Sequence, residues 1–376
     1  MNRYGLSFNS CVKLGDDIWF SATNYNGLYR YNLKDTSIER VVTFPNEEMW
    51  QMGLHNTICL YHDSIVFVPH WAERVSIYNT KNGLLRQIEV PDLGSRVCSA
   101  PDFLCGVVYH EMLYMVGYKY SGIVKVDLKT GEFRTIYEAD EWINIFVEEY
   151  FGEVAVEDNY MYIPCQFQNS ILILDMKHDT AEKKSIGKDS NRYCRIVKDG
   201  KNVYLIDKNT SNFITWNVDD DSWRETEVQF KNPGTNAYIN YSKEHIWVIS
   251  VLSGEVCIID KGTGKRRNIF LNNKPVVEYA FSRSERVYFV DGYTGNWYFI
   301  DNQGVIIDLN IKMIEPDNIR MEDIWQGFSP SRFDGVVGER SPYTLQYLIF
   351  HAREKGMETE CNKSNVGNTV WNFLNP

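Results

Sequence analysis

The residues of this chain with the most chemical potential lie in polar stretches between short apolar segments. His55 begins one apolar segment and His70 follows the next one. A histidine in such a place can act as a general base, because its ordinary pKa lies near neutrality. Carboxylates in similar stretches are Glu48, Asp102, Glu148, Glu149 and Glu153.

Paired carboxylates can hydrolyse a glycosidic bond when their separation is about 5–5.5 Å or about 6.5–9.5 Å. The sequence does not establish such a separation. A carbohydrate-active hydrolase or lyase is therefore an alternative function, and no catalytic residue is assigned.

Aromatic rings are frequent in the same polar stretches, where they alternate with Asn, Gln, Asp and Glu. Such rings stack on sugars or anchor a protein partner. Arg192 could in addition pair with an anion. The predicted ligand-binding residues are Trp50, His55, His70, Trp71, Arg74, Asp102, Tyr118, Tyr120, Trp142, Glu153, Phe167 and Arg192.

Motifs for metals, nucleotides and activated serines are missing from the sequence. There is no H-E-x-x-H, no P-loop and no G-x-S-x-G. Asp219-Asp220-Asp221 could attract a cation, but its position between two apolar segments favours a solvated turn. We therefore expect neither a metal nor a cofactor.

An internal repeat organises the chain. Its unit is an apolar residue, then Asp or Asn, then a polar turn and an alternating strand. The seven copies are Tyr31-Asn32, Tyr78-Asn79, Val126-Asp127, Leu174-Asp175, Trp216-Asn217, Ile259-Asp260 and Ile300-Asp301. The steps between them are 47, 48, 48, 42, 43 and 41 residues, close to the period of a four-stranded propeller blade.

Each copy predicts four strands. In the third copy these are Leu104 to Tyr109, Met112 to Val116, Ile123 to Leu128 and Glu132 to Tyr137. The Asp or Asn is expected to accept the backbone N–H two residues later and so start the turn. One such blade exposes two apolar faces, which a ring of blades can bury.

This pattern resembles the β-propeller superfamily over residues 5–310, in the broad sense that includes WD40-like, kelch-like and quinoprotein-like rings. The WD40 and kelch signatures themselves are missing. The resemblance implies an all-β, seven-bladed β-propeller of four-stranded antiparallel blades, which would span residues 1–310. The first repeat begins with its own inner strand near Leu6 to Leu14 and the last repeat has its own outer strand, so we expect no exchanged strand. The resemblance also implies that loops between blades and loops from the second to the third strand share one face. The predicted ligand site would lie on this face, over blades 1–4.

Residues 311–376 carry no eighth repeat and form a predicted C-terminal extension. A helix near 342–355 is indicated by Ser341 as N-cap, Pro342 at the first position and Gly356 as the stop. We expect this helix to pack on the propeller. The alternative is a docking element for a partner or a second subunit.

The net charge of −11 disfavours nucleic acid and anionic membranes as partners. No segment is apolar enough to span a membrane, and the first ten residues predict no secretory signal. The eight cysteines form no C-x-x-C pair, which favours free thiols and a cytoplasmic location. The preferred hypothesis is a non-catalytic propeller that binds a glycan, another small molecule or a protein surface. A protein-interaction scaffold is a further alternative.

Overall fold

The structure, a computed structural model, describes most of the chain before residue 313. The described residues are 6, 8–23, 26–47, 53–91, 93, 103–118, 120–139, 150–230, 237–250, 254–271, 277–283, 285–291, 296–301 and 303–312. They all belong to one compact unit, Tyr4–Ile319. A second unit, Met1–Arg3 with Arg320–Pro376, and the helix predicted near 342–355 lie outside the described residues.

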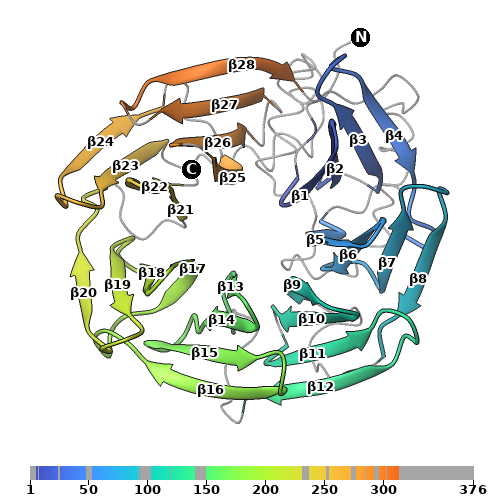
Figure 1. Cartoon of the computed structure of the whole chain (residues 1–376), viewed down its shortest axis with the longest axis horizontal. Helices are drawn as coiled ribbons and strands as arrows, with labels where there is room; N and C mark the ends of the chain where they lie inside the picture. Colours follow the sequence, from blue (N-terminus) through green and yellow to red (C-terminus); the bar gives the residue numbers. More distant parts are fainter. Residues whose placement is uncertain are drawn as a thin grey trace, which may run out of the picture. The chain divides into compact units, whose positions relative to one another are not determined.

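The described residues form 28 strands in seven four-stranded sheets, each built from four consecutive antiparallel strands. The sheets surround a central opening, with the first strand of each sheet nearest to it (Figure 1). The fold is a seven-bladed β-propeller. No helix occurs among the described residues.

Blades 1 to 4 consist of β1 (Cys11–Leu14), β2 (Asp17–Ser21), β3 (Leu28–Asn32), β4 (Ile38–Val42); β5 (His55–Tyr61), β6 (Ser64–Pro69), β7 (Arg74–Asn79), β8 (Leu85–Glu89); β9 (Phe103–Tyr109), β10 (Met112–Gly117), β11 (Gly122–Asp127), β12 (Phe133–Glu138); β13 (Ala155–Glu157), β14 (Tyr160–Pro164), β15 (Ser170–Asp175) and β16 (Thr180–Ser185). Blades 5 to 7 consist of β17 (Tyr193–Asp199), β18 (Asn202–Asp207), β19 (Phe213–Asn217), β20 (Trp223–Thr226); β21 (Ala237–Tyr241), β22 (His245–Ser250), β23 (Glu255–Asp260), β24 (Arg266–Phe270); β25 (Val277–Arg283), β26 (Arg286–Asp291), β27 (Asn296–Asp301) and β28 (Ile306–Lys312). The four strands predicted for the third copy agree with β9–β12 to within a residue or two.

The repeated Asn or Asp starts the turn between the third and fourth strands, as predicted. In six blades its Oδ1 accepts the backbone N–H two residues later, at 2.7–3.0 Å. In blade 6, Asp260 accepts the N–H of Thr263 at 2.6 Å instead. This local hydrogen bond closes every such turn independently of its neighbours.

Apolar cores fill the spaces between consecutive blades. Between blades 2 and 3, for example, Val66 and Val68 of β6 pack with Phe103, Leu113 and Met115, all fully buried. Each such side chain contributes about 1.5–3 kcal/mol by leaving water. Clusters of this kind lie between each pair of consecutive blades from blade 1 to blade 7, so a single blade on its own would expose these apolar faces to water.

The ring closes without an exchanged strand, since β1–β4 and β25–β28 are each a complete sheet. At this seam Phe8, fully buried, packs on Trp297 of β27 with ring centroids 5.5 Å apart. Ring packing between the first and last blades therefore contributes to closure.

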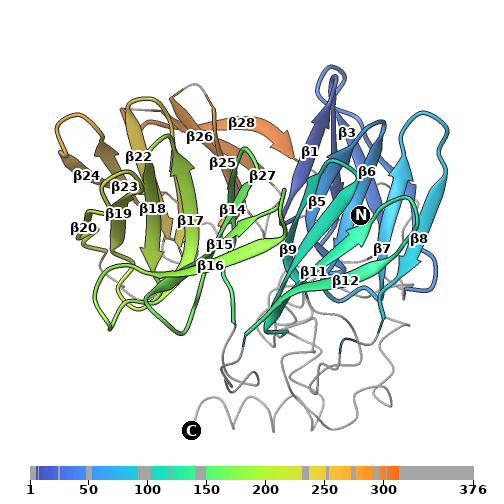
Figure 2. The same ribbon diagram turned by 60° about the horizontal axis from the view of Figure 1, so that its bottom comes forward.

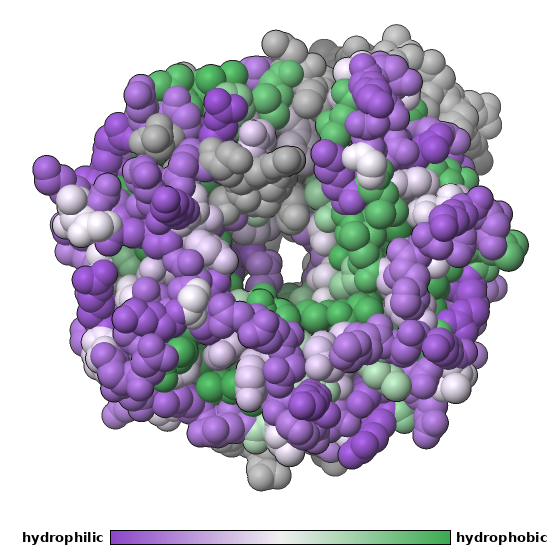
Figure 3. Space-filling view, in the orientation of Figure 1, coloured by the Kyte–Doolittle hydropathy of each residue, from purple (hydrophilic) through white to green (hydrophobic). Residues whose placement is uncertain are grey.

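The inner strands give the opening an uneven lining. On the face seen in Figure 3, apolar side chains gather beside the opening near β5 and β9. Leu60 of β5 is 44% exposed. On the other side, Lys198 of β17 is buried and forms an ion pair with Glu157 of β13 at 2.8 Å.

The strands of every blade run between two ends of the propeller (Figure 2). One end carries the turns from first to second and from third to fourth strand, and we call it the hairpin end. The other carries the second-to-third loops and the connections between blades, and we call it the loop end.

Candidate functional site

The predicted ligand-binding residues that the structure describes all belong to the loop end. They precede or begin an inner strand, or lie at or just after the second-to-third connection: His55, His70, Trp71, Arg74, Tyr118, Tyr120, Glu153, Phe167 and Arg192. Trp50, Asp102 and Trp142 lie outside the described residues. The shared end follows from the antiparallel order of the strands within each blade.

Three of these rings pack together across blades 2 and 3. The His70 ring lies edge-on to Trp71 and to Tyr118, with centroids 5.1 Å apart in both pairs. His70 is buried, and its Nδ1 lies 3.2 Å from the Phe103 carbonyl oxygen of blade 3. Trp71 and Tyr118 are half-buried. A buried histidine thus holds two partly accessible rings in fixed positions.

A second ring pair continues this surface onto blade 4. The Tyr150 amide donates to the Tyr118 carbonyl at 3.3 Å, and the Tyr150 ring packs on Phe167 with centroids 4.5 Å apart. Tyr150 is fully buried and Phe167 half-buried. We call His70, Trp71, Tyr118, Tyr150 and Phe167 the aromatic row. It crosses three blades, and three of its rings are partly open to solvent.

The backbone beneath the aromatic row is tightly packed. A Cβ on Gly53 would lie 2.9 Å from Trp71 Cδ1, so the indole rests directly on this glycine. A Cβ on Gly152 would lie 2.2 Å from the Cys194 carbonyl oxygen of blade 5. Gln166 Nε2 also donates to the Phe151 carbonyl at 2.8 Å. These contacts hold the row on a rigid support.

His55 is in the core and is not available as a general base, which corrects its predicted role at the surface. It is 2% exposed, and its ring packs on Phe44 and Phe67 with centroids 4.5 and 5.3 Å away. Ser21 Oγ lies 3.0 Å from its Nδ1. Burial, and to a lesser extent His70, lowers the pKa of His55 to about 3. The imidazole is therefore neutral at physiological pH.

Tyr120 is also a core residue, because its loop turns the ring inward. It is 8% exposed and lies edge-on to Phe103, with centroids 6.5 Å apart. A Cβ on Gly122 would lie 2.5 Å from this ring, so the glycine makes room for it. Tyr120 therefore supports the packing of blades 2 and 3 and presents no surface to a ligand.

The two predicted arginines differ in how they are held. The Arg192 Nη1 donates to the carbonyls of Asp189 and Asn191, at 2.7 and 2.6 Å, so its charge stabilises its own loop. Arg74 begins β7 and is half-buried, near the Glu47 carboxylate. Burial raises the pKa of Glu47, while the Glu73 amide that donates to it at 2.9 Å lowers that pKa.

Glu153 forms an ion pair with Arg195 of β17. The Arg195 guanidinium carbon lies 3.8 Å from the centroid of the Tyr238 ring, on β21. Burial is the largest single influence on the pKa of Arg195 and lowers it, but Glu153, Tyr238 and Cys194 together raise this pKa by more, so the net shift is upward. Glu153 still has 45% of its side chain exposed, so one face of this carboxylate can accept a hydrogen bond from a ligand.

Sequence reasoning missed two residues that organise this end. Arg195 could have been noticed as a charge between two apolar residues, Cys194 and Ile196, in an inner strand. Asp207, 1% exposed, accepts the backbone N–H groups of Asn209, Thr210 and Arg192 and the side-chain amide of Asn191. It closes the blade 5 loop into a compact turn, so this blade lacks the open aromatic surface of blades 2 to 4.

Two acidic clusters could attract metals. Asp220 and Asp221 lie in an exposed turn, as expected, and contact Ser222, Trp216 and Lys184. Ligand atoms of Glu244, His245 and Glu285 lie within 4.8 Å of one another. The Glu285 carboxylate already accepts hydrogen bonds from Ser242 Oγ and the Glu244 amide, and it pairs with His245 Nδ1 at 3.0 Å. These contacts join blade 6 to blade 7.

The sequence matches no protein-family model and no curated protein. Solved structures do resemble this chain. Virginiamycin B lyase from Staphylococcus aureus is 13% identical, with a TM-score of 0.61, and the match covers 78% of this chain and 95% of that one. The extracellular domain of the putative one component system BT4673 from B. thetaiotaomicron is 15% identical, with a TM-score of 0.55, and the match covers 80% and 41%.

A computationally designed protein, Ika8, is 9% identical with a TM-score of 0.59, and the match covers 84% of this chain and 90% of that one. These likenesses show the fold alone. Among the described residues, no helix is long and apolar enough to cross a membrane.

Proposed function

We propose that this propeller is a binding protein that recognises a carbohydrate at its loop end, on the aromatic row. One observation carries the proposal: Trp71 and Tyr118 are half-buried rings locked edge-on by a buried histidine. Such rings offer apolar area to the C–H face of a sugar without losing side-chain freedom on binding. The exposed part of Glu153 can accept a sugar hydroxyl.

Binding without catalysis is favoured by how the three candidate bases among the described residues are engaged. His55 is neutral and buried, His70 lies against a backbone carbonyl, and Glu153 is paired with Arg195. Two of the structural neighbours are a lyase and an extracellular domain of a one component system. The hydrolase or lyase alternative therefore remains an outcome to be tested.

Cytoplasmic location is part of the same proposal. It is supported by Cys59 and Cys194, free thiols whose pKa is raised to about 12 by burial. Fractionation of the producing cells tests it, and recovery outside the cytoplasm would contradict it.

A glycan array on the intact chain, with each hit titrated by thermal shift, tests the proposal. Trp71→Ala should weaken binding by roughly 2 kcal/mol, or about 30-fold, as for a central aromatic anchor. Trp223→Ala is the matched control, since this indole is 43% exposed on β20 of blade 5. Unchanged affinity in Trp71→Ala would refute the site. Turnover of a bound glycan would replace binding with catalysis.

A further inference from the structure

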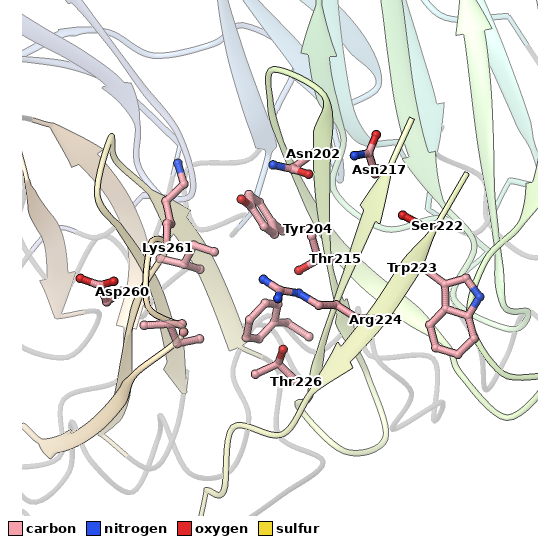
Figure 4. A pocket seen from close by; sticks show the side chains of 14 residues that line it. Asn202, Tyr204, Thr215, Asn217, Ser222, Trp223, Arg224, Thr226, Asp260 and Lys261 are labelled. Atoms are coloured by element: carbon pink, nitrogen blue, oxygen red, sulfur yellow. The ribbon is translucent and has the colours of Figure 1, made fainter. Parts of the chain in front are cut away.

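A groove lies between blades 5 and 6, apart from the aromatic row (Figure 4). Its volume is about 390 Å³, within the range of small-molecule pockets. Its apolar lining consists mainly of four buried side chains, each at most 4% exposed: Tyr204, Phe213, Ile246 and Ile259. The groove therefore has an apolar floor, and its volume suits a small organic molecule.

A row of three paired residues crosses the blade 5 side of this groove. Tyr204, Thr215 and Arg224 stand opposite one another on β18, β19 and β20. The Arg224 guanidinium reaches into the groove beside Tyr204 and Thr215 (Figure 4). Within the described part of the chain, Arg224 forms no ion pair and the buried Oγ1 of Thr215 has no hydrogen-bond partner. The groove thus presents an uncompensated cation and an unsatisfied hydroxyl.

The equivalent three residues of blade 3 have an acidic partner on the next blade. There Tyr114, Lys125 and Arg134 stand opposite one another. All three engage Asp179 of the next blade, at 2.7, 2.9 and 3.6 Å. Asp179 is the fourth residue after the repeated Asp of its turn and has a φ of 54°. In blade 6 the residue at this position is Gly264, with a φ of 70°.

Blade 2 has an acceptor at its corresponding arginine as well. The Arg86 guanidinium donates to the carbonyls of Leu128 and Lys129 in the blade 3 turn. Gly264 lines the groove, and a Cβ added to it would meet nothing within 4 Å. The blade 5–6 interface therefore keeps the arginine of this arrangement but leaves the place of the carboxylate open.

The other two charged residues that line the groove, Lys261 and Asp260, already have partners within the protein. Lys261 forms an ion pair with Asp199 and donates to the Ser242 carbonyl at 2.8 Å. The Asp260 carboxylate accepts the N–H and the Oγ1–H of Thr263, at 2.6 and 2.7 Å. Arg224 is left as the group that an added anion would pair with.

We propose that this groove binds a small organic anion. Its carboxylate or phosphate pairs with Arg224 and accepts the Thr215 hydroxyl, in the place that Asp179 fills between blades 3 and 4. Its apolar body covers Tyr204, Phe213, Ile246 and Ile259. A planar guanidinium suits both oxyanions, because it can donate two parallel hydrogen bonds. The site is independent of the aromatic row and of the function proposed for it.

Calorimetric titration of the intact chain with benzoate and with phenyl phosphate tests this site. Benzyl alcohol and inorganic phosphate are the matched probes that lack the charge or the apolar body. We expect at least one of the two aromatic anions to bind at least tenfold more tightly than either matched probe, and the stronger one identifies the preferred oxyanion. No heat with either aromatic anion at millimolar concentration, or equal binding of benzyl alcohol, would overturn the proposal.

Two substitutions on opposite sides of the groove locate the binding. Arg224→Gln should weaken binding at least tenfold. Gly264→Asp should do the same by supplying the internal carboxylate that Asp179 supplies elsewhere, whereas Gly264→Asn, of the same size but uncharged, should retain binding. Arg134→Gln, at the equivalent position of blade 3, should bind like the unmodified chain. Binding that survives both Arg224→Gln and Gly264→Asp would refute the assignment, and circular dichroism checks that each variant is folded.

Discussion

At the hairpin end the blades are alike, whereas at the loop end they differ from one another. An Asn or Asp closes every turn between third and fourth strands by a local hydrogen bond, as Asn79 does with the Lys81 amide at 3.0 Å. Among the described residues of the loop end, no side-chain hydrogen bond recurs in all seven blades. Blade 4 joins blade 5 by packing Gly152 on the Cys194 backbone, whereas blade 5 closes its own loop with Asp207. The repeated end builds the scaffold, and the varied end is where recognition can evolve.

The largest effect should come from disturbing a close approach at the loop end. Gly152→Ala would place a Cβ 2.2 Å from the Cys194 carbonyl oxygen, which is backbone and cannot move aside. We expect a loss of about 3 kcal/mol or more in the free energy of unfolding, measured with denaturant.

The matched change at the hairpin end is Gly200→Ala. Gly200 has a φ of 54° and nothing within 4 Å of an added Cβ. The cost should be only about 1 kcal/mol, from the left-handed conformation alone. Equal losses in the two variants would contradict the difference between the ends.

The pH dependence of stability should report the buried histidine beneath the loop end. The pKa of His55 is about 3 in the folded chain, below its ordinary value of 6.5. Between pH 3 and pH 6.5, His55 is therefore protonated in the unfolded chain and neutral in the folded chain. Stability from this group is therefore complete above pH 6.5 and falls as the pH drops toward 3, by roughly 1.4 kcal/mol for each pH unit.

Denaturant unfolding at pH 7, 6 and 5 measures this slope. His55→Phe should reduce it, while His110→Asn should not, since His110 is an exposed turn residue. An unchanged slope in His55→Phe would show that His55 accepts a proton in the folded state.

The smallest effect should come from one copy of the repeated turn. Asn79→Ala removes the acceptor of the Lys81 and Asn82 amides, at 3.0 and 3.1 Å, and should cost about 1 kcal/mol. Asn79→Asp should restore stability, because Asp fills this position in four other blades. A loss as large as that of Gly152→Ala would mean that the turn does more than close locally.

The fold could be predicted because its signal is local and occurs seven times. An Asp such as Asp127 bonds to its own turn, so its role is visible in a few residues of sequence. The burial of His55 and Tyr120 could not be predicted, because it depends on how each loop turns over a neighbouring blade. A polar stretch of sequence does not show which of its side chains points inward.

Contacts between blades were the hardest to predict. Arg192 and Arg195 are three residues apart, yet one holds its own loop and the other pairs with Glu153 of the preceding blade. The sequence shows that Asp179 is replaced by Gly264 at the same position of blade 6. Only the structure shows that Asp179 faces Arg134 and that Gly264 lies across from Arg224. A sequence repeat therefore predicts the contacts within a blade far better than the contacts between blades.

Nuclear magnetic resonance of the indole N–H groups tests the assignment of recognition to the loop end most directly. The chain has ten tryptophans, and Trp71→Phe and Trp223→Phe identify the two resonances needed. During titration with a glycan from the array, the Trp71 signal should shift with the occupancy of the site while the Trp223 signal stays in place. A shift of Trp223 with Trp71 unmoved would contradict the account.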